Sequence, residues 1–311
     1  MWSPDLTPER PPPLFIVQNQ GSGHEDAAAR RAATAAVLTA AGREHYFVLA
    51  ARGAEVPARA AEAVARAQAA GGVVVAAGGD GTQNAVANAA LGRCVMGVLP
   101  QGTFNYFART HGVPADPQAA ARLLVTGRPQ PVQVGLVGER AFLVNASLGL
   151  YPQLLEDREA WKARLGRSQL VALGAAAASL LSLHRPMRLH LTSPRGAADL
   201  MALTLFVGNN PLQCAQLGLP EPERVGEGWL AGLLLKPVGT WRMLGLMARG
   251  ALGRLGEADD LMRATFQTVH VQPRRKRRTV KVAMDGEVLR LRAPLVFRVS
   301  PTPLWILKAD Q

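Results

Sequence analysis

Residues 73–91 read VVVAAGGDGTQNAVANAAL and join an apolar run to a helical pattern through a glycine-rich turn. The run at 73–76 is continuously apolar, which is typical of a strand buried on both faces. The pattern at 83–91 has helical spacing, and the three glycines between the two segments permit a tight connection. This order of strand, turn and helix is the building unit of an α/β domain with a parallel sheet.

The same order recurs on both sides of this segment. Upstream, a strand is predicted at 14–18 with a helix at 24–42, then a strand at 45–50 with a helix at 56–70. Downstream, a strand is predicted at 95–99 and a helix from about residue 104. Residues 1–130 are therefore expected to form an α/β domain whose parallel sheet has helices on both faces.

From about residue 131 the pattern becomes alternating, as in strands with one buried face. Strands are predicted at 188–192, 201–207, 230–235, 269–271, 280–284 and 288–292. Helical patterns interrupt them at 170–183 and 241–255. Residues 131–311 are expected to form a second, mostly β domain, and we leave open whether the last residues return to the first.

Composition narrows the function classes. The 311 residues are 48% hydrophobic and carry a net charge of +12, and all five lysines lie at or after Lys162. The first domain therefore has no lysine for a P-loop or for a protein-kinase strand, and no G-x-G-x-x-G fingerprint occurs in its first loop. Two distant cysteines, Cys94 and Cys214, support neither a disulfide framework nor a zinc site and fit a reducing cytosol.

Three loops at the carboxyl ends of predicted strands are the candidate site, because α/β sheets bind ligands there. They follow the strands at 14–18, 73–76 and 95–99 and are rich in glycine, hydroxyl and amide residues. Their backbone N–H groups suit an anion, Asp80 can hold magnesium, and Thr82 can bond a phosphate oxygen or cap its helix. Together they indicate a polyphosphate ligand. The alternative is that they are ordinary tight turns, with Thr82 and Asn105 as caps.

The motifs in these loops resemble the diacylglycerol kinase catalytic-domain superfamily, which includes bacterial lipid kinases and the sphingosine and ceramide kinases. The resemblance rests on GGDGTQN at 78–84, LPQGTFNYFAR at 99–109 and DGE at 285–287, and it extends over nearly the whole chain. NAD kinases look similar at the first motif, but the second motif at this spacing favours the lipid kinases.

The resemblance implies ATP and magnesium bound between the α/β domain and a β-sandwich domain. The implied nucleotide-binding residues are Asn19, Gln20, Gly21, Ser22, Gly23, Gly78, Gly79, Asp80, Gly81, Thr82, Gln83, Asn84, Gly102, Thr103 and Asn105. It also implies that Glu287 accepts the proton of the lipid hydroxyl, with Asp285 as the alternative base. Taken alone, however, Asp285-Gly286 between apolar strands predicts a hairpin turn, and the two interpretations are compatible.

The chain departs from the family pattern at several positions. Tyr106 stands where the family commonly has an aspartate, and Leu49-Ala50-Ala51 lacks the family's nucleotide-side threonine. The family's structural magnesium site would map to Glu227, in place of an aspartate, with the carbonyls of Arg224 and Trp229. Alternatives to a diacylglycerol kinase are therefore a sphingoid-base or NAD kinase on the same scaffold, or an inactive nucleotide- or lipid-binding regulator.

The basic residues at 274–278, the arginine-bearing helical pattern at 241–255 and nearby tryptophans favour contact with an anionic membrane surface. No nucleic-acid-binding motif accompanies them, so a nucleic-acid partner is not expected. The start of the chain lacks a signal-peptide pattern and no stretch is long enough to span a membrane. We expect a cytoplasmic enzyme bound peripherally to the inner face of the cell membrane, and leave open whether it forms a homodimer.

Overall fold

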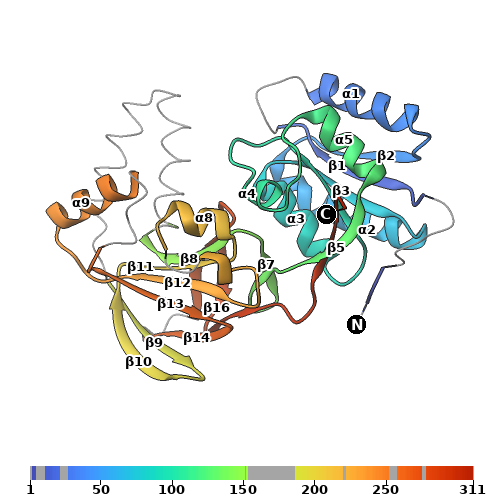
Figure 1. Cartoon of the computed structure of the whole chain (residues 1–311). Coiled ribbons are helices and arrows are strands. Elements are labelled where there is room, and N and C mark those ends of the chain that lie inside the picture. Colours follow the sequence, from blue (N-terminus) through green and yellow to red (C-terminus); the bar gives the residue numbers. More distant parts are fainter. Residues whose placement is uncertain are drawn as a thin grey trace. The chain divides into compact units, whose positions relative to one another are not determined.

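The computed structural model describes residues 2–4, 11–21, 27–150, 152, 186–219, 222–251, 258–274 and 278–310. The chain divides into two compact units, the first formed by Met1–Val134 with Ser300–Gln311 and the second by Gly135–Val299 (Figure 1). The division lies four residues beyond the predicted boundary at 130, and the end of the chain returns to the first unit.

The first unit contains a six-stranded sheet in the order β2-β1-β3-β4-β18-β5. Neighbouring strands from β2 through β4 to β18 pair in parallel, and β5 is antiparallel to β18. The strands are β1 (Leu14–Asn19), β2 (His45–Ala50), β3 (Val73–Gly78), β4 (Met96–Pro100), β5 (Arg128–Val132) and β18 (Leu304–Lys308). The helices are α1 (Ala27–Ala40), η1 (Gly53–Glu55), α2 (Val56–Ala69), α3 (Asp80–Ala90), α4 (Tyr106–Thr110) and α5 (Pro117–Thr126).

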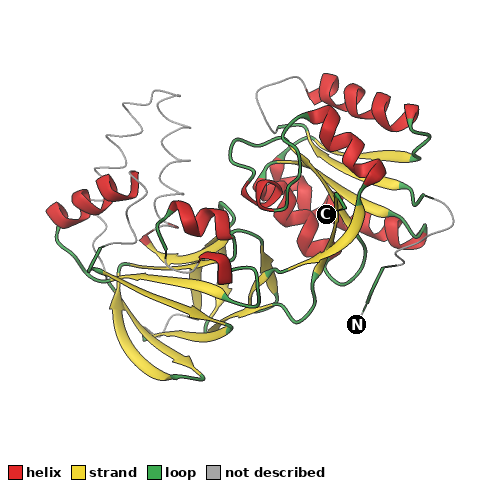
Figure 2. Ribbon diagram, viewed as in Figure 1, coloured by secondary structure: helices red, strands yellow, loops and turns green. Residues whose placement is uncertain are grey.

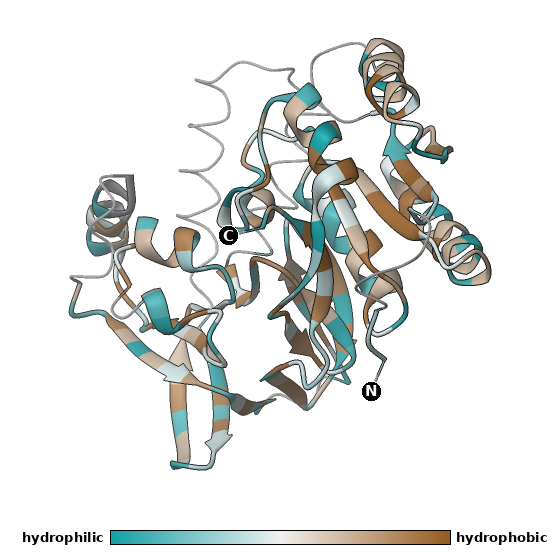
Figure 3. Cartoon of the chain, turned by 45° about the vertical axis from the view of Figure 1, so that its right-hand side comes forward, coloured by the Kyte–Doolittle hydropathy of each residue, from teal (hydrophilic) through white to brown (hydrophobic). Residues whose placement is uncertain are grey.

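Helices cover both faces of this sheet, as the sequence predicted (Figure 2). Leu14 and Ile16 of β1 are fully buried and share a core cluster with Leu38 of α1 and Leu124 of α5. On the other face, α2 packs against β1 and α3 packs against β3. The central strands β1, β3 and β4 are accordingly hydrophobic almost throughout (Figure 3), because a strand covered on both sides has no face left for polar residues.

Helix α3 begins earlier than predicted. The expected start was residue 83, but Gly79 adopts an extended conformation and precedes a helix whose first residue is Asp80. The sequence GDGT is therefore the junction and first helical turn, not a separate turn before the helix. This places the Asp80 carboxylate at the positive end of the helix dipole, where negative charge is favoured.

The second unit contains two six-stranded antiparallel sheets, ordered β10-β9-β14-β17-β6-β7 and β13-β12-β11-β8-β15-β16. Their strands are β6 (Gly135–Val137), β7 (Arg140–Phe142), β8 (Asn145–Gly149), β9 (Met187–Ser193), β10 (Gly196–Ala202), β11 (Thr204–Gly208), β12 (Leu230–Leu235), β13 (Leu261–Phe266), β14 (Thr268–Pro273), β15 (Thr279–Met284), β16 (Glu287–Arg292) and β17 (Leu295–Val299). The helices described are α8 (Pro211–Gln216), η2 (Pro222–Arg224) and α9 (Thr240–Ala251).

One hydrophobic core joins these two sheets. Leu189, Val271 and Phe297 from one sheet share a buried cluster with Leu148 and Leu234 from the other. The second unit is therefore a β-sandwich, in agreement with the predicted fold class.

Two strand predictions in this unit were wrong in detail. Residues 201–207 form parts of two strands, because the chain turns at Leu203 between β10 and β11. Strand β12 was expected to alternate but is buried at every position. Leu234 faces the core between the sheets, while Leu233 faces a second cluster that includes Met243 of α9.

The helix predicted at 241–255 is observed as α9, which ends at Ala251, and residues 252–257 lie outside the described part of the chain. The helix predicted at 170–183 also lies outside it. No helix in the described residues combines the length and the hydropathy needed to cross a membrane.

Candidate functional site

The loops after β1, β3 and β4 meet in the first unit. Asn19, at the end of β1, donates from Nδ2 to Oγ1 of Thr82 in α3 at 3.4 Å. The backbone N–H of Gln101, after β4, donates to the carbonyl of Gly78 at 3.0 Å. The structure therefore brings together the three loops that the sequence indicated. Ser22 and Gly23 of the first loop lie outside the described residues, whereas Gln20 and Gly21 continue the chain from Asn19.

Glycine is required where these loops touch. A Cβ at Gly102 would lie 2.7 Å from the Cα of Gly79, and a Cβ at Gly78 would lie 2.4 Å from Oγ1 of Thr82. Real side chains do not tolerate such approaches, so the backbones of the two loops pack directly against each other. The result is a surface made largely of backbone, in which N–H groups can approach an anion closely.

Asp80 lies at the centre of this arrangement. Its Oδ1 accepts the backbone N–H of Phe107 in α4 at 3.4 Å. Burial raises the pKa of Asp80, and the backbone N–H groups of Phe107, Asn105 and Tyr106 partly oppose that increase. A carboxylate in this position can bind a divalent cation through hard oxygen atoms, the ligands that magnesium prefers.

Asn105 and Gln83 support the loops from within. Asn105 adopts a left-handed conformation with φ 48°, which asparagine tolerates better than most residues. Its Oδ1 accepts the N–H of Gly102 at 2.9 Å, and its Nδ2 donates to the carbonyl of Gly102 at 2.7 Å. Gln83 is fully buried and donates from Nε2 to the carbonyl of Gly78 at 3.1 Å. Both residues were predicted to bind the nucleotide. In the structure their side chains instead support the backbone of the loops that are expected to contact the nucleotide.

The remaining predicted residues of this region lie at the surface or in the first turns of α3. Thr103 is exposed, and Gly81 is half-buried in the first turn of α3. Asn84 lies in the following turn, where its Oδ1 accepts a hydrogen bond from Nδ2 of Asn88 at 3.0 Å. Ala50, in the segment that lacks the family's threonine, accepts the backbone N–H of Gln20 at 3.0 Å.

The half-buried ring of Tyr106 stacks on the exposed ring of Phe104. Its ring lies parallel to that of Phe104, with centroids 5.7 Å apart, and the guanidinium of Arg109 lies 5.9 Å from the Tyr106 centroid. Phe104 itself is 57% exposed. At the position where the family commonly has a carboxylate, this chain therefore carries a half-buried aromatic ring, and the backbone N–H of Tyr106 faces Asp80 instead.

In the second unit, Asp285 and Gly286 form the tight turn between β15 and β16. Their φ angles are 47° and 90°, and Met284 pairs with Glu287 across the turn. Positive φ at both central residues is the geometry of a type I′ hairpin, which the Asp-Gly pair favours. The hairpin predicted from the sequence is confirmed, and it projects Glu287 from the first position of β16.

The Asp285 carboxylate is buried and fully engaged by backbone. It accepts the N–H groups of Leu143 at 2.7 Å and of Val144 and Asn145 at 2.9 Å each. Only 8% of the residue is exposed. Three hydrogen bonds from backbone N–H groups hold this carboxylate in a fixed position. The geometry therefore assigns Asp285 to positioning the hairpin and leaves Glu287 as the candidate base.

Glu287 is exposed to solvent. Partial desolvation raises its pKa, and the positive charge of Arg140 opposes the shift. An accessible carboxylate with a raised pKa is a suitable general base, since its ideal pKa lies nearer the working pH than that of an ordinary glutamate.

A group of amide side chains around the Asp285 turn was not predicted from the sequence. Asn209 donates from Nδ2 to the carbonyl of Leu143 at 3.0 Å, and Asn145 donates from Nδ2 to Oε1 of Gln213 in α8 at 2.9 Å. The signal was present, because asparagine interrupts apolar segments at both positions. Their pairing required the fold, since the partners lie more than sixty residues apart in sequence.

The loop predicted as a structural magnesium site is closed by backbone hydrogen bonds. The N–H of Glu227 donates to the carbonyl of Arg224 at 3.2 Å, and the N–H of Gly226 donates to the carbonyl of Trp229 at 3.4 Å. Glu227 is exposed. The structure places the three predicted residues in one tight loop, with two of the proposed ligand carbonyls already accepting a hydrogen bond.

Known proteins resemble this chain in sequence over the first unit and, in some relatives, over most of its length. The family model for the diacylglycerol kinase catalytic domain matches residues 13–137. A Pseudomonas aeruginosa (strain UCBPP-PA14) protein named "Probable lipid kinase YegS-like" is 32% identical over 236 residues, which cover 73% of each chain. A protein of the same name from Serratia proteamaculans (strain 568) is 40% identical over 95 residues, which cover 28% of this chain and only 31% of that relative.

Solved structures share the fold over nearly the whole chain. A crystal structure of a diacylglycerol kinase from Bacillus anthracis str. Sterne has a TM-score of 0.67 and 19% sequence identity, and the match covers 98% of this chain and 99% of that one. A further structure from the same organism has a TM-score of 0.71 at 20% identity, covering 96% and 98%. At this identity the likeness concerns the fold alone.

Proposed function

The chain belongs to the lipid kinase family that carries the diacylglycerol kinase catalytic domain, and from this premise we propose that it transfers the γ-phosphoryl group of ATP to the hydroxyl of a diacylglycerol-like lipid. The observation that carries the proposal is the meeting of three glycine-rich loops around Asp80, at the carboxyl ends of parallel strands. That place is where α/β sheets bind ligands, and its exposed backbone suits phosphate.

The residues of the first unit fit a nucleotide phosphate and a divalent cation. Side chains are excluded where Gly79 and Gly102 touch, which leaves backbone for the anion to approach. Asp80 offers carboxylate oxygen, the donor type that magnesium requires. Magnesium, when bound, would neutralise charge on the transferring phosphate. The residues proposed to contact the nucleotide or the cation are Asn19, Gly78, Gly79, Asp80, Thr82, Gly102 and Thr103.

In the proposed reaction Glu287 acts as the general base. The hydroxyl oxygen of the lipid attacks the γ-phosphorus, the bond from that phosphorus to the bridging oxygen of ADP breaks, and the hydroxyl proton passes to Glu287. The products are the phosphorylated lipid and ADP. Asp285 is a positioning residue, because its carboxylate ties the turn that carries Glu287 to the backbone at 143–145.

We further propose that the protein reaches its lipid at an anionic membrane surface. Trp241 in α9 is 85% exposed while Met243 and Leu246 of the same helix are buried. Tryptophan favours the interface between water and lipid, and the chain's net charge of +12 favours anionic headgroups. Cosedimentation with vesicles containing phosphatidylglycerol tests this, and equal binding by wild type and Trp241→Ala would count against a role for this helix.

A panel of acceptors tests the proposed function against its alternatives. Purified protein is incubated with γ-labelled ATP, magnesium and either diacylglycerol, sphingosine, a total bacterial lipid extract or NAD. Label in diacylglycerol supports the proposal, whereas label in sphingosine or NAD would replace it with a kinase of that class. ATP binding with no labelled product would indicate an inactive nucleotide- or lipid-binding regulator. Tyr106 and the missing threonine favour that alternative.

A further inference from the structure

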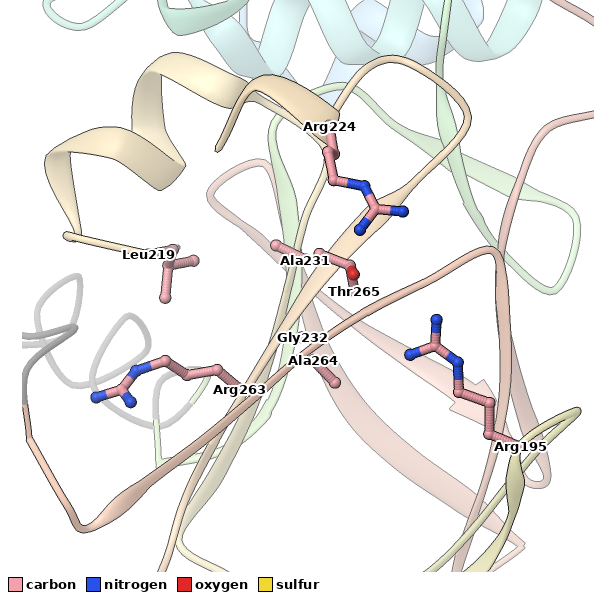
Figure 4. A pocket seen from close by; sticks show the side chains of 8 residues that line it. All are labelled: Arg195, Leu219, Arg224, Ala231, Gly232, Arg263, Ala264 and Thr265. Carbon is pink, nitrogen blue, oxygen red and sulfur yellow. The ribbon is translucent and has the colours of Figure 1, made fainter. Parts of the chain in front are cut away.

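A second polar site lies in the β-sandwich, away from the turn that carries Glu287. A cavity of about 330 Å³ opens over strands β12 and β13 (Figure 4). Four residues of these strands line it, Ala231, Gly232, Ala264 and Thr265, together with Leu219, Arg195, Arg224 and Arg263. No carboxylate is among these lining residues in the described part of the chain.

Small residues keep this cavity open. Ala231 and Thr265 are cross-strand partners in β12 and β13, and Gly232 pairs with Ala264 beside them. A Cβ at Gly232 would lie 2.9 Å from the ring of Phe266, so β12 cannot carry a larger residue at this position without movement. The small lining residues leave room for a ligand in the cavity.

The arginines come from three separate elements. Arg195 lies in the turn between β9 and β10, Arg224 ends η2, and Arg263 lies in β13. Figure 4 shows the guanidinium groups of Arg195 and Arg224 extending toward each other, with the Thr265 hydroxyl between them, while that of Arg263 extends to the opposite side. Arg263 donates to the carbonyl of Ala258 at 2.8 Å, and its buried Nε lacks a hydrogen-bond partner among the described residues.

Trp229 holds two of these cations close to each other. The guanidinium carbon of Arg224 lies 4.5 Å from the Trp229 ring centroid and that of Arg195 lies 5.8 Å from it. Both distances are within the range of cation–π attraction. Two like charges beside one ring repel each other, and an anion between them removes that repulsion. Guanidinium forks match phosphate oxygens in pairs, which favours phosphate over a monovalent ion.

We propose that this cavity is a phosphate-binding site, in which Arg195, Arg224 and the Thr265 hydroxyl hold the phosphate and Arg263 adds positive potential at the far end. Its volume is near the lower limit for ligand pockets, so the ligand is inorganic phosphate or a phosphorylated headgroup of similar size. The site is separate from the proposed transfer reaction and needs neither ATP nor magnesium.

Calorimetric titration without nucleotide or metal tests the proposal. Inorganic phosphate and glycerol 3-phosphate are titrated into wild type, Arg195→Gln, Ala264→Glu and the control Arg292→Gln. Arg195 and Ala264 are exposed, so both variants should fold, which thermal unfolding checks. We expect Arg195→Gln to weaken binding about tenfold or more, since the charged hydrogen-bond donor to the phosphate is lost. Ala264→Glu, which adds a carboxylate to the lining of the cavity, should abolish binding.

A control variant and a vesicle-binding assay complete the experiment. Arg292 is exposed at the end of β16 and does not line the cavity, so its variant should bind like wild type. Unchanged phosphate binding in both cavity variants, or none by wild type at millimolar phosphate, would overturn the proposal. Cosedimentation with phosphatidylcholine vesicles with and without phosphatidate identifies the source. Loss of phosphatidate-dependent binding in Ala264→Glu indicates a lipid headgroup, and an effect confined to soluble esters indicates a soluble phosphate.

Discussion

Asp285 and Asn145 bind each other through two hydrogen bonds. The N–H of Asp285 donates to the carbonyl of Asn145 at 3.0 Å, and Oδ1 of Asp285 accepts the N–H of Asn145 at 2.9 Å. These residues are 140 positions apart. The contact fixes the turn before Glu287 to the start of β8, so the orientation of the candidate base Glu287 depends on a buried carboxylate.

Removing this carboxylate should destabilise the second unit. Asp285→Ala leaves three buried N–H groups without an acceptor, and we expect the free energy of unfolding to fall by about 3–5 kcal/mol. Asp285→Asn retains one acceptor oxygen and should lie between this variant and wild type. Urea unfolding measures both values. A fully stable Asp285→Ala protein without activity would contradict the positioning role and return Asp285 to the reacting groups.

Removing the Asp80 carboxylate is expected not to destabilise the protein, in contrast to removing that of Asp285. Burial raises the pKa of Asp80, so the folded state disfavours the charge relative to the unfolded chain, and the ionised carboxylate lowers stability at neutral pH. Asp80→Asn removes that cost and should leave the free energy of unfolding unchanged or higher at neutral pH. Turnover should fall by about a hundredfold or more. Urea unfolding and the lipid assay are run on the same preparation, and loss of stability together with activity would argue against this account.

The backbone contact between Gly79 and Gly102 makes a packing prediction. Gly102→Ala places a Cβ against the Cα of Gly79, and overpacking of this kind costs about 1–3 kcal/mol. We expect weaker ATP binding in equilibrium dialysis as the loops separate. Gly53→Ala is the matched control, because a Cβ at Gly53 would meet no other atom within 4 Å among the described residues. Equal ATP affinity in the two variants would show that the contact does not shape the site.

The imidazole of His111 is expected to make the stability of the first unit depend on pH. Burial lowers the pKa of His111 from 6.5 to about 4, with a smaller contribution from the charge of Lys308. Between these values the unfolded chain binds the proton and the folded chain does not, so stability should decrease as the pH falls from 6.5 to about 4. The loss is at most about 3 kcal/mol. His111→Phe keeps an aromatic ring against Phe107 and should reduce the pH dependence of the free energy of unfolding measured in urea. An unchanged pH dependence in this variant would mean that other groups cause it.

Local patterns predicted the parts of the fold that depend on neighbouring residues. The apolar runs at β1 and β3 and the Asp-Gly turn at 285–286 were all correct, because periodicity and turn preference are properties of short segments. The start of α3 at Asp80 was not predicted, since glycine beside an aspartate also suits a loop. The burial of β12 on both faces was missed because α9, which covers its second face, follows later in the chain.

The candidate site was predictable to a similar degree. Residues 78–84, 99–109 and 285–287 were recognised from their motifs, and the convergence of the first two follows from the parallel sheet. Three features depend on contacts between distant segments and could not be predicted. These are the Asp285 contact with Asn145, the supporting role of Gln83, and the arginines from three elements that line one cavity.

The transfer of labelled phosphate to diacylglycerol by wild type and by Glu287→Gln tests the central claim most directly. Both proteins are incubated with γ-labelled ATP, magnesium and mixed micelles, and kcat is measured across a range of pH. We expect Glu287→Gln to fold normally and to lose about 10²–10⁴-fold in kcat. The wild-type rate should rise with pH through the raised pKa of Glu287, because the base must be ionised to accept the proton. Wild-type activity and an unchanged pH profile in Glu287→Gln would contradict the account.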